Sequence, residues 1–195
     1  MKYMDIERFP AKKIRIFDLV NGKFFPGSKE KFKPSYLITP FGEKISRVNL
    51  IGTVIDKFVS EDENYSTITL DDGSESVRAK AFREKVKILK NVEVGDMVLV
   101  IGKVKEFNGE LYVNAEVVKK IEDPNYESLR KLEILKKLIS QKEMVKEIKN
   151  LQNELSEEEL KNYAKQKFKL NEESLRAILE SKKWKKLIIN QRCLN

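Results

Sequence analysis

Residues 47–123 read RVNLIGTVIDKFVSEDENYSTITLDDGSESVRAKAFREKVKILKNVEVGDMVLVIGKVKEFNGELYVNAEVVKKIED, and this stretch decides the fold. It contains five runs rich in β-branched and aromatic residues, a composition typical of strands. Asp72-Gly73 and Asn108-Gly109 each join two of these runs, and such dipeptides supply the positive φ angles that tight hairpin turns need. A short helix is expected between the third and fourth runs, ahead of a turn at Gly95-Asp96.

This order of elements predicts a mainly β protein with a five-stranded Greek-key barrel of the OB type. Gly52 is expected to form a bulge that lets the long first strand curl into both halves of the closed sheet. The predicted domains are an N-terminal extension packed on the barrel (1–46), the OB-fold barrel (47–123), a long helix (124–151) and a small helical C-terminal module (152–195).

The bulk composition excludes several classes of protein. A chain of 195 residues with 41% hydrophobic content can bury one good core. It has no apolar run long enough to span a membrane and no apolar signal region in MKYMDIERFP, so we expect a cytoplasmic protein. With one cysteine (Cys193) and no histidine, neither a zinc site nor the usual general base is expected. No phosphate loop or nucleophile–base pair is visible, so we predict a non-enzyme without cofactors.

The net charge of +8 is unevenly distributed along the chain. Residues 1–46 carry 10 Lys/Arg and 5 Asp/Glu, residues 47–123 carry 12 and 15, and residues 124–195 carry 17 and 11. The barrel is therefore slightly acidic, and a basic face on it requires that cationic side chains be sorted to one side.

The two hairpins predict such a face. If Asp72-Gly73 is a two-residue turn, Tyr65 opposes Lys80 and Thr67 opposes Arg78. If Asn108-Gly109 is the second turn, Lys105 opposes Tyr112 and Lys103 opposes Asn114. The expected core side comprises Ile68, Val77, Ala79, Ala81, Val104, Leu111, Val113 and Ala115. The nucleic-acid-binding residues predicted on the other side are Tyr65, Arg78, Lys80, Phe82, Lys103, Lys105, Phe107 and Tyr112.

Rows that interleave aromatic rings with cations are typical of barrels that bind single strands, because bases stack on the rings while the cations follow the phosphates. Two interpretations of Phe82 and Phe107 stay open from the pattern alone. Each ring either stacks on a base or plugs one end of the barrel as a core residue.

Five segments together resemble the middle-subunit OB fold of replication protein A: IGTVIDKF, TITLDDGS, VRAKAF, VGDMVLVIGKVKEFNGELYV and EDPNYESLRKLEIL. The upstream FPAKKIRIFDLV and KPSYLITPFGEKISRVNLIGTV are similar to archaeal proteins associated with replication protein A. The resemblance covers about residues 8–140. It implies a non-catalytic subunit that binds single-stranded DNA in replication, repair and recombination, together with other subunits of a replication protein A-like complex. It also places Phe82 and Phe107 where that family has aromatic residues.

Residues 125–151 are predicted to form one long helix, with Pro124 in its first turn and Asp123 as its cap. An apolar stripe along it is the predicted partner-binding surface, and it comprises Leu129, Leu132, Leu135, Leu138, Ile139 and Val145. The resemblance implies that such a helix joins partner helices in a bundle. Packing of the stripe against its own barrel is the alternative.

The remaining segments carry less specific signals. KKIRIFDLV and SYLIT suggest short strands, and the lysine-rich loop between them is either a phosphate contact or a solvated surface. Ser156 with Glu159 forms a capping box, and Asn171 caps a second short helix. We expect these two helices to pack together, with Trp184, as a docking module. A purely structural subunit with little DNA contact is the alternative function, because the barrel is acidic overall.

Overall fold

The computed structural model describes residues 9–27 and 34–181 of the chain. The N-terminal elements are β1 (Lys12–Lys13), α1 (Ile16–Val20), β2 (Lys23–Phe25), β3 (Tyr36–Ile38) and β4 (Lys44–Ile45). Next come β5 (Arg47–Val59), β6 (Tyr65–Asp71), β7 (Ser76–Phe82), the 3-10 helix η1 (Arg83–Leu89), β8 (Met97–Phe107) and β9 (Glu110–Lys120). The helices α2 (Asn125–Leu151), α3 (Glu157–Phe168) and α4 (Glu172–Glu180) complete the described part.

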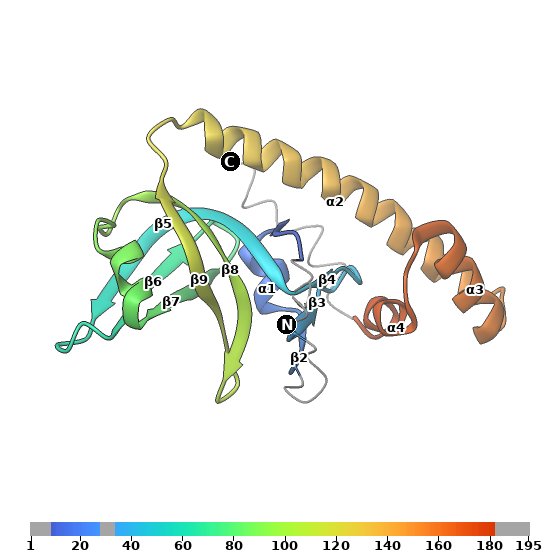
Figure 1. Ribbon diagram of the computed structural model, residues 1–195. Coiled ribbons are helices and arrows are strands. Elements are labelled where there is room, and N and C mark those ends of the chain that lie inside the picture. Colours follow the sequence, from blue (N-terminus) through green and yellow to red (C-terminus); the bar gives the residue numbers. More distant parts are fainter. Residues whose placement is uncertain (1–8, 28–33, 182–195) are drawn as a thin grey trace, which may run out of the picture.

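Strands β5 to β9 close into a barrel. The sheet order is β1-β5-β6-β7-β9-β8, and β5 also pairs with β8, which closes the ring. Within the ring, β7 and β9 run parallel while the other neighbours run antiparallel. This is the five-stranded barrel with OB topology that the sequence predicts, so the predicted fold class is confirmed. In Figure 1 the barrel occupies one end of the molecule, and α3 and α4 occupy the other.

The long strand β5 serves both halves of the barrel, but its irregularity is not at the predicted position. Its first half pairs with β8 and its second half with β6, and Thr53 pairs with both. The register shift lies between Val54 and Asp56, so Ile55 is the bulged residue and the prediction for Gly52 is wrong. A Cβ at residue 52 would lie 2.8 Å from the Asp71 carbonyl oxygen. Gly52 is therefore needed for the close approach of β6 at the closure.

The β6–β7 hairpin differs from its predicted register by two residues. Tyr65 opposes Phe82, Thr67 opposes Lys80 and Asp71 opposes Ser76. Only Gly73 has a positive φ in this loop, whereas a two-residue type I′ turn needs two such residues. The side chains of the loop are also engaged elsewhere, because the Ile16 N–H donates to Asp72 Oδ2 at 2.8 Å and the Phe17 N–H donates to Ser74 Oγ at 3.1 Å.

A shift of two residues preserves the faces of both strands. The predicted core residues of this hairpin are accordingly buried: Ile68, Val77, Ala79 and Ala81.

The β8–β9 hairpin has the predicted register. Lys105 opposes Tyr112, Lys103 opposes Asn114, and the turn residues Asn108 and Gly109 have φ angles of 52° and 79°. Both central residues of the turn adopt the positive φ that a type I′ turn requires. The predicted core positions Val104, Val113 and Ala115 are fully buried, and Leu111 packs against the same core.

The N-terminal segment packs against the barrel and also against the C-terminal helices. The strand predicted for KKIRI is limited to Lys12–Lys13, and Ile16 begins α1 instead. Ile14, Ile16 and Leu37 belong to the barrel core cluster. Phe41, on the β3–β4 turn, belongs to a second cluster formed by α2, α3 and α4.

Helix α2 is fastened to the barrel near its beginning. Arg130 is buried, and its guanidinium donates to the backbone oxygen and to Oδ1 of Asn49, both at 2.9 Å. The same guanidinium lies beside Glu133, whose carboxylate also accepts a hydrogen bond from Lys13. Further along, Val145 and Ile148 are buried in the cluster with α3 and α4. Figure 1 shows α2 extending from the barrel to these two helices.

The predicted apolar stripe of α2 divides onto two different faces. Leu129, Leu132 and Ile139 are exposed, at 55%, 64% and 52% of their surface. Val145 is buried among the chain's own helices, and Leu138 packs against the same cluster. Val145 therefore does not belong to the predicted partner surface. The physical reason is the rotation of about 100° per residue, which places positions 129, 132 and 139 opposite position 145.

The starts of α3 and α4 agree with the predicted signals, whereas the N-cap of α2 lies one residue later than predicted, at Pro124 rather than Asp123. Ser156 and Glu159 form the capping box, the Asn171 side chain accepts from the Ser174 amide, and Asp123 Oδ1 accepts from the Asn125 amide. The predictions for Trp184 and Cys193 lie outside the described residues, as do residues 28–33 of the lysine-rich loop. No helix in the described ranges is long and apolar enough to cross a membrane.

Candidate nucleic-acid interface

The barrel places the two predicted rows side by side on its outer surface. The parallel pairing of β7 with β9 puts Arg78 opposite Tyr112 and Lys80 opposite Asn114. Tyr112 in turn opposes Lys105 across the β8–β9 hairpin. One continuous surface therefore combines β6, β7, β9 and β8. Of the predicted residues, Tyr65, Arg78, Lys80, Phe82, Lys105 and Tyr112 are brought together here.

Three aromatic rings from three strands form a row at one edge of this surface. The ring centroids of Phe58 and Tyr65 are 6.2 Å apart, and those of Tyr65 and Phe82 are 5.3 Å apart. Phe58 and Phe82 are 53% and 42% exposed. Both rings are thus accessible from solvent, and Phe82 does not plug the barrel.

Phe58 is the residue that sequence reasoning missed. In an uninterrupted strand it would share the core side of β5 with Leu50 and Val54. The bulge at Ile55 reverses the alternation, so that Phe58 turns outward. If the bulge had been predicted at Ile55 instead of Gly52, the sequence would have placed Phe58 on the outer face.

The loop between β5 and β6 is held by the carboxylate of Asp62. The Ser60 hydroxyl donates to Asp62 Oδ1 at 2.5 Å, and the backbone and side-chain amides of Asn64 donate to the same carboxylate at 3.1 and 3.0 Å. These bonds, with that from Ser60 first, lower the pKa of Asp62 to about 2. The Arg83 N–H donates to the Asn64 carbonyl at 2.8 Å. The loop is therefore tied to the end of β7, where Phe82 lies.

The centre of the surface is a cluster of two cations, a tyrosine and a glutamate. Lys80 Nζ lies 4.5 Å from the ring centroid of Tyr112, a cation–π contact. Arg78 Nη1 lies 2.9 Å from Glu110 Oε1, and Lys80 Nζ lies 3.6 Å from Glu110 Oε2. Burial raises the pKa of Tyr112, with a smaller contribution from Tyr65, so its hydroxyl stays protonated near neutral pH.

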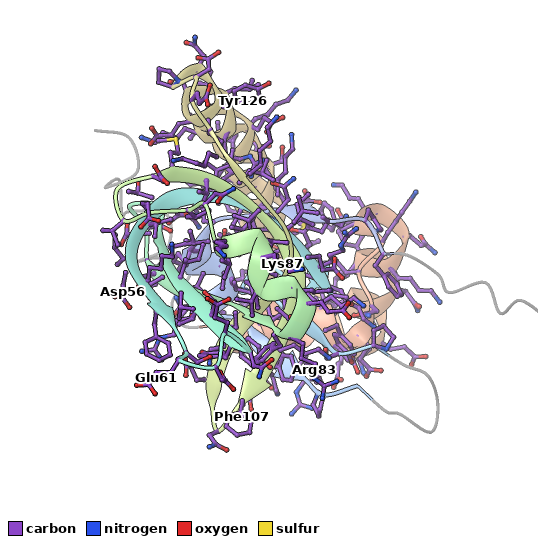
Figure 2. All side chains as sticks on the ribbon, turned by 60° about the vertical axis from the view of Figure 1, so that its left-hand side comes forward. Asp56, Glu61, Arg83, Lys87, Phe107 and Tyr126 are labelled. Carbon is purple, nitrogen blue, oxygen red and sulfur yellow. The ribbon has the colours of Figure 1, made fainter. Side chains whose placement is uncertain are left out.

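Phe107 projects from the end of the β8–β9 hairpin. Its side chain is 66% exposed, which excludes a role as a barrel plug. Figure 2 shows it at the same end of the molecule as Glu61 and Arg83, and opposite Tyr126. Lys105 precedes it on the same side of β8.

Lys103 lies further along β8, beside a second glutamate. Its Nζ is 3.7 Å from Glu116 Oε1, and Glu116 Oε2 is 2.6 Å from Arg47 Nε. Lys103 thus extends the row of cations away from Phe107, although a carboxylate partly neutralises it.

This arrangement can stack unpaired bases on exposed rings while cations contact the phosphates between them. Fold and surface together define a class of protein: small OB-fold barrels whose outer sheet and hairpin loops contact oligonucleotides.

Comparison with known proteins supports this class at the level of fold. Residues 48–121 match the family model tRNA_anti-codon, described as an OB-fold nucleic acid binding domain. None of the proteins with curated descriptions matches the chain.

Two solved structures resemble most of the chain. One is a chain of a replication protein A heterotrimer bound to single-stranded DNA, with 13% identity, a TM-score of 0.55, and coverage of 68% of this chain and 98% of that chain. The other comes from the S. pombe Stn1–Ten1 complex, with 17% identity, a TM-score of 0.57, and coverage of 70% and 96%. The predicted resemblance to replication protein A is confirmed as a likeness of fold.

Proposed function

We propose that this protein is a non-catalytic subunit of a replication protein A-like complex that binds single-stranded DNA in replication, repair and recombination. The observation that carries the proposal is the row of rings Phe58, Tyr65 and Phe82 on the same surface as two cations next to Tyr112. Lys80 lies over the Tyr112 ring, and Lys105 opposes Tyr112 across the hairpin. Accessible rings flanked by cations bind single strands with little sequence preference, because every base has a face that can stack. The cytoplasmic location expected from the sequence stays a prediction.

A titration of labelled oligothymidine with the full chain at low salt tests this function. We expect weak binding that declines as salt rises, because lysine and arginine contacts release counterions from the strand. The matched control is the same sequence annealed into a duplex, whose paired bases cannot stack on the rings and which should bind less tightly. Absence of binding at high micromolar protein would reject a direct role in DNA binding.

A second candidate is a structural subunit that holds partners while other subunits bind DNA. The specific observation in its favour is that Glu110 and Glu116 pair with four cations on this surface: Arg78, Lys80, Arg47 and Lys103. A surface neutralised in this way attracts phosphates less strongly than its lysines and arginines suggest. The oligothymidine titration separates the two candidates.

We propose in either case that α2 contacts another subunit through its outer face, defined as Leu129, Leu132 and Ile139. These side chains are 52–64% exposed and lie opposite the face that packs on this chain. A run of large apolar side chains on one side of a helix is typical of an interaction surface. The partner best suited to it is an amphipathic helix of another subunit.

A further inference from the structure

The cations at the centre of the interface already hold an anion from the chain itself. Glu110 follows the Asn108-Gly109 turn directly and opposes Phe107 across the hairpin. Its two carboxylate oxygens contact two different cations, with Oε1 at 2.9 Å from Arg78 and Oε2 at 3.6 Å from Lys80. The carboxylate thus lies between the same two charges that a phosphate of a bound strand would approach.

The two cations are poorly placed to accept a phosphate while Glu110 remains between them. The Lys80 side chain is only 12% exposed and lies over the Tyr112 ring, so it cannot simply turn toward solvent to meet a strand. Arg78 is 53% exposed, but one edge of its guanidinium is already engaged by the carboxylate. Guanidinium groups bind carboxylates and phosphates with similar forked geometry, so the two anions compete for one position.

The Arg78–Glu110 ion pair, which a phosphate must displace, is nevertheless weak. The Glu110 side chain is 43% exposed, and ion pairs between partly solvated groups contribute little to stability. On release, Glu110 can turn toward water at the hairpin end, and the phosphate that replaces it keeps a negative charge beside the buried Lys80 ammonium.

We infer that Glu110 is an internal competitor that occupies the phosphate position between Arg78 and Lys80 and lowers the affinity of this surface for a single strand. The inference rests on the proposed function and concerns regulation of the same site. It implies that affinity can be raised by removing one charge at Glu110, without any new contact to DNA.

The variant Glu110→Gln tests this inference, because it keeps the side-chain length and removes the charge. The matched control is Glu106→Gln, which makes the same change of charge in the same hairpin. Glu106 is exposed and alternates with Lys105 and Phe107, so it lies on the opposite side of β8. Both variants and the wild-type chain are titrated with labelled oligothymidine of about 16 nucleotides, the upper end of the site size of one OB fold.

We expect Glu110→Gln to bind on the order of fivefold more tightly at low salt, as the loss of one like charge near a phosphate implies. Its affinity should also fall more steeply with salt, by about 0.7 in the logarithmic slope, because one more strand charge is neutralised without internal competition. Glu106→Gln should change affinity by less than about twofold, since its charge is farther from the bound strand.

Two outcomes would overturn it, and they differ in what they say about the proposed function. If the wild-type chain binds and Glu110→Gln binds no more tightly, or Glu106→Gln gains as much, Glu110 is no competitor but DNA binding stands. If the wild-type chain does not bind at high micromolar protein, the proposed function fails and the inference with it. Thermal unfolding of Glu110→Gln serves as the structural readout: a large fall in Tm without a gain in affinity assigns Glu110 a structural role instead.

Discussion

At the scale of single residues, the exposed rings differ in how firmly they are held. Tyr65 and Phe82 face each other across two paired strands, with Phe58 beside Tyr65. Phe107 is at the end of a hairpin and is the most exposed large apolar side chain of the described ranges. For the proposed binding of single strands, the row is therefore already arranged for stacking, whereas Phe107 can adjust to a base.

Phe107→Ala should weaken the binding of a single strand by about 1–3 kcal/mol, the usual contribution of one base–aromatic stack. The free energy of unfolding should stay within about 0.5 kcal/mol of the wild type, because an exposed side chain leaves no cavity. Oligothymidine titration and thermal unfolding of the same variant check both values. Tyr126→Ala is the control, since it removes an exposed ring at the opposite end of the molecule. Unchanged affinity in Phe107→Ala would remove this ring from the interface.

Ser60→Ala should raise the pKa of Asp62 from about 2 toward its ordinary value of 3.8, because the Ser60 hydroxyl is the largest cause of the shift. The lowered pKa means that these hydrogen bonds stabilise the folded loop above about pH 4 and that this contribution is lost as the pH falls from 3.8 toward 2. NMR titration of the Asp62 carboxyl carbon measures both midpoints. A wild-type midpoint near 3.8 would contradict the hydrogen-bonded loop.

At the scale of elements, local signals succeeded wherever no distant segment intervened. The β8–β9 register follows from Asn108-Gly109, whose two residues both adopt positive φ. The β6–β7 register could not be predicted, because Asp72 and Ser74 hold the backbone of α1, more than 50 residues earlier in the chain. Phe58 was missed for a related reason. The barrel closes with a bulge at Ile55, and no local sequence signal marks a bulge there.

The periodicity of α2 showed how much apolar surface the helix has, but not how that surface is divided between the face packed on this chain and the face left exposed. Val145 and Ile148 pack on α3 and α4, whereas Leu129 and Leu132 stay exposed. Two apolar faces on one helix give a broad stripe in the sequence, and only the positions of α3 and α4 decide which face remains free.

Leu132→Glu should abolish association with the partner subunit and leave the chain folded. Leu132 is 64% exposed, so its replacement should change the free energy of unfolding by less than about 0.5 kcal/mol. A charge placed within an apolar interface, in contrast, loses its hydration without gaining a partner. Sedimentation of the chain with its co-purified subunits measures the assembly.

Asn153→Glu, which adds the same charge at an exposed position after α2, is the control for this variant. If Leu132→Glu assembles as well as the control, the outer face of α2 is not the contact.

At the scale of the whole molecule, the N-terminal segment joins the barrel to the helices. Its residues Ile14, Ile16 and Leu37 lie in the barrel core, while Phe41 lies in the helical cluster. Figure 1 shows the N-terminal strands between the barrel and α4. The composition of residues 34–46 did not show that Phe41 packs on helices more than 100 residues later.

Phe41→Ala should cost about 3–5 kcal/mol of stability, because it empties the space of a ring that is only 2% exposed. The loss should fall mainly on α3 and α4, so amide hydrogen exchange should accelerate there more than in β8. Phe9→Ala, the same substitution at an exposed phenylalanine, should leave exchange unchanged. Equal acceleration throughout the barrel and the helices would show that the two clusters unfold as one unit.

The most direct test of the central claim is to map the contact surface by NMR while oligothymidine is added to the full chain. The account predicts that chemical-shift changes concentrate on Phe58, Tyr65, Phe82 and Phe107 and on the strands around Lys80, while α2 and its outer face remain unchanged. Shifts confined to the helices, or no shifts with excess oligonucleotide at low salt, would contradict the assignment of this barrel surface to single-stranded DNA.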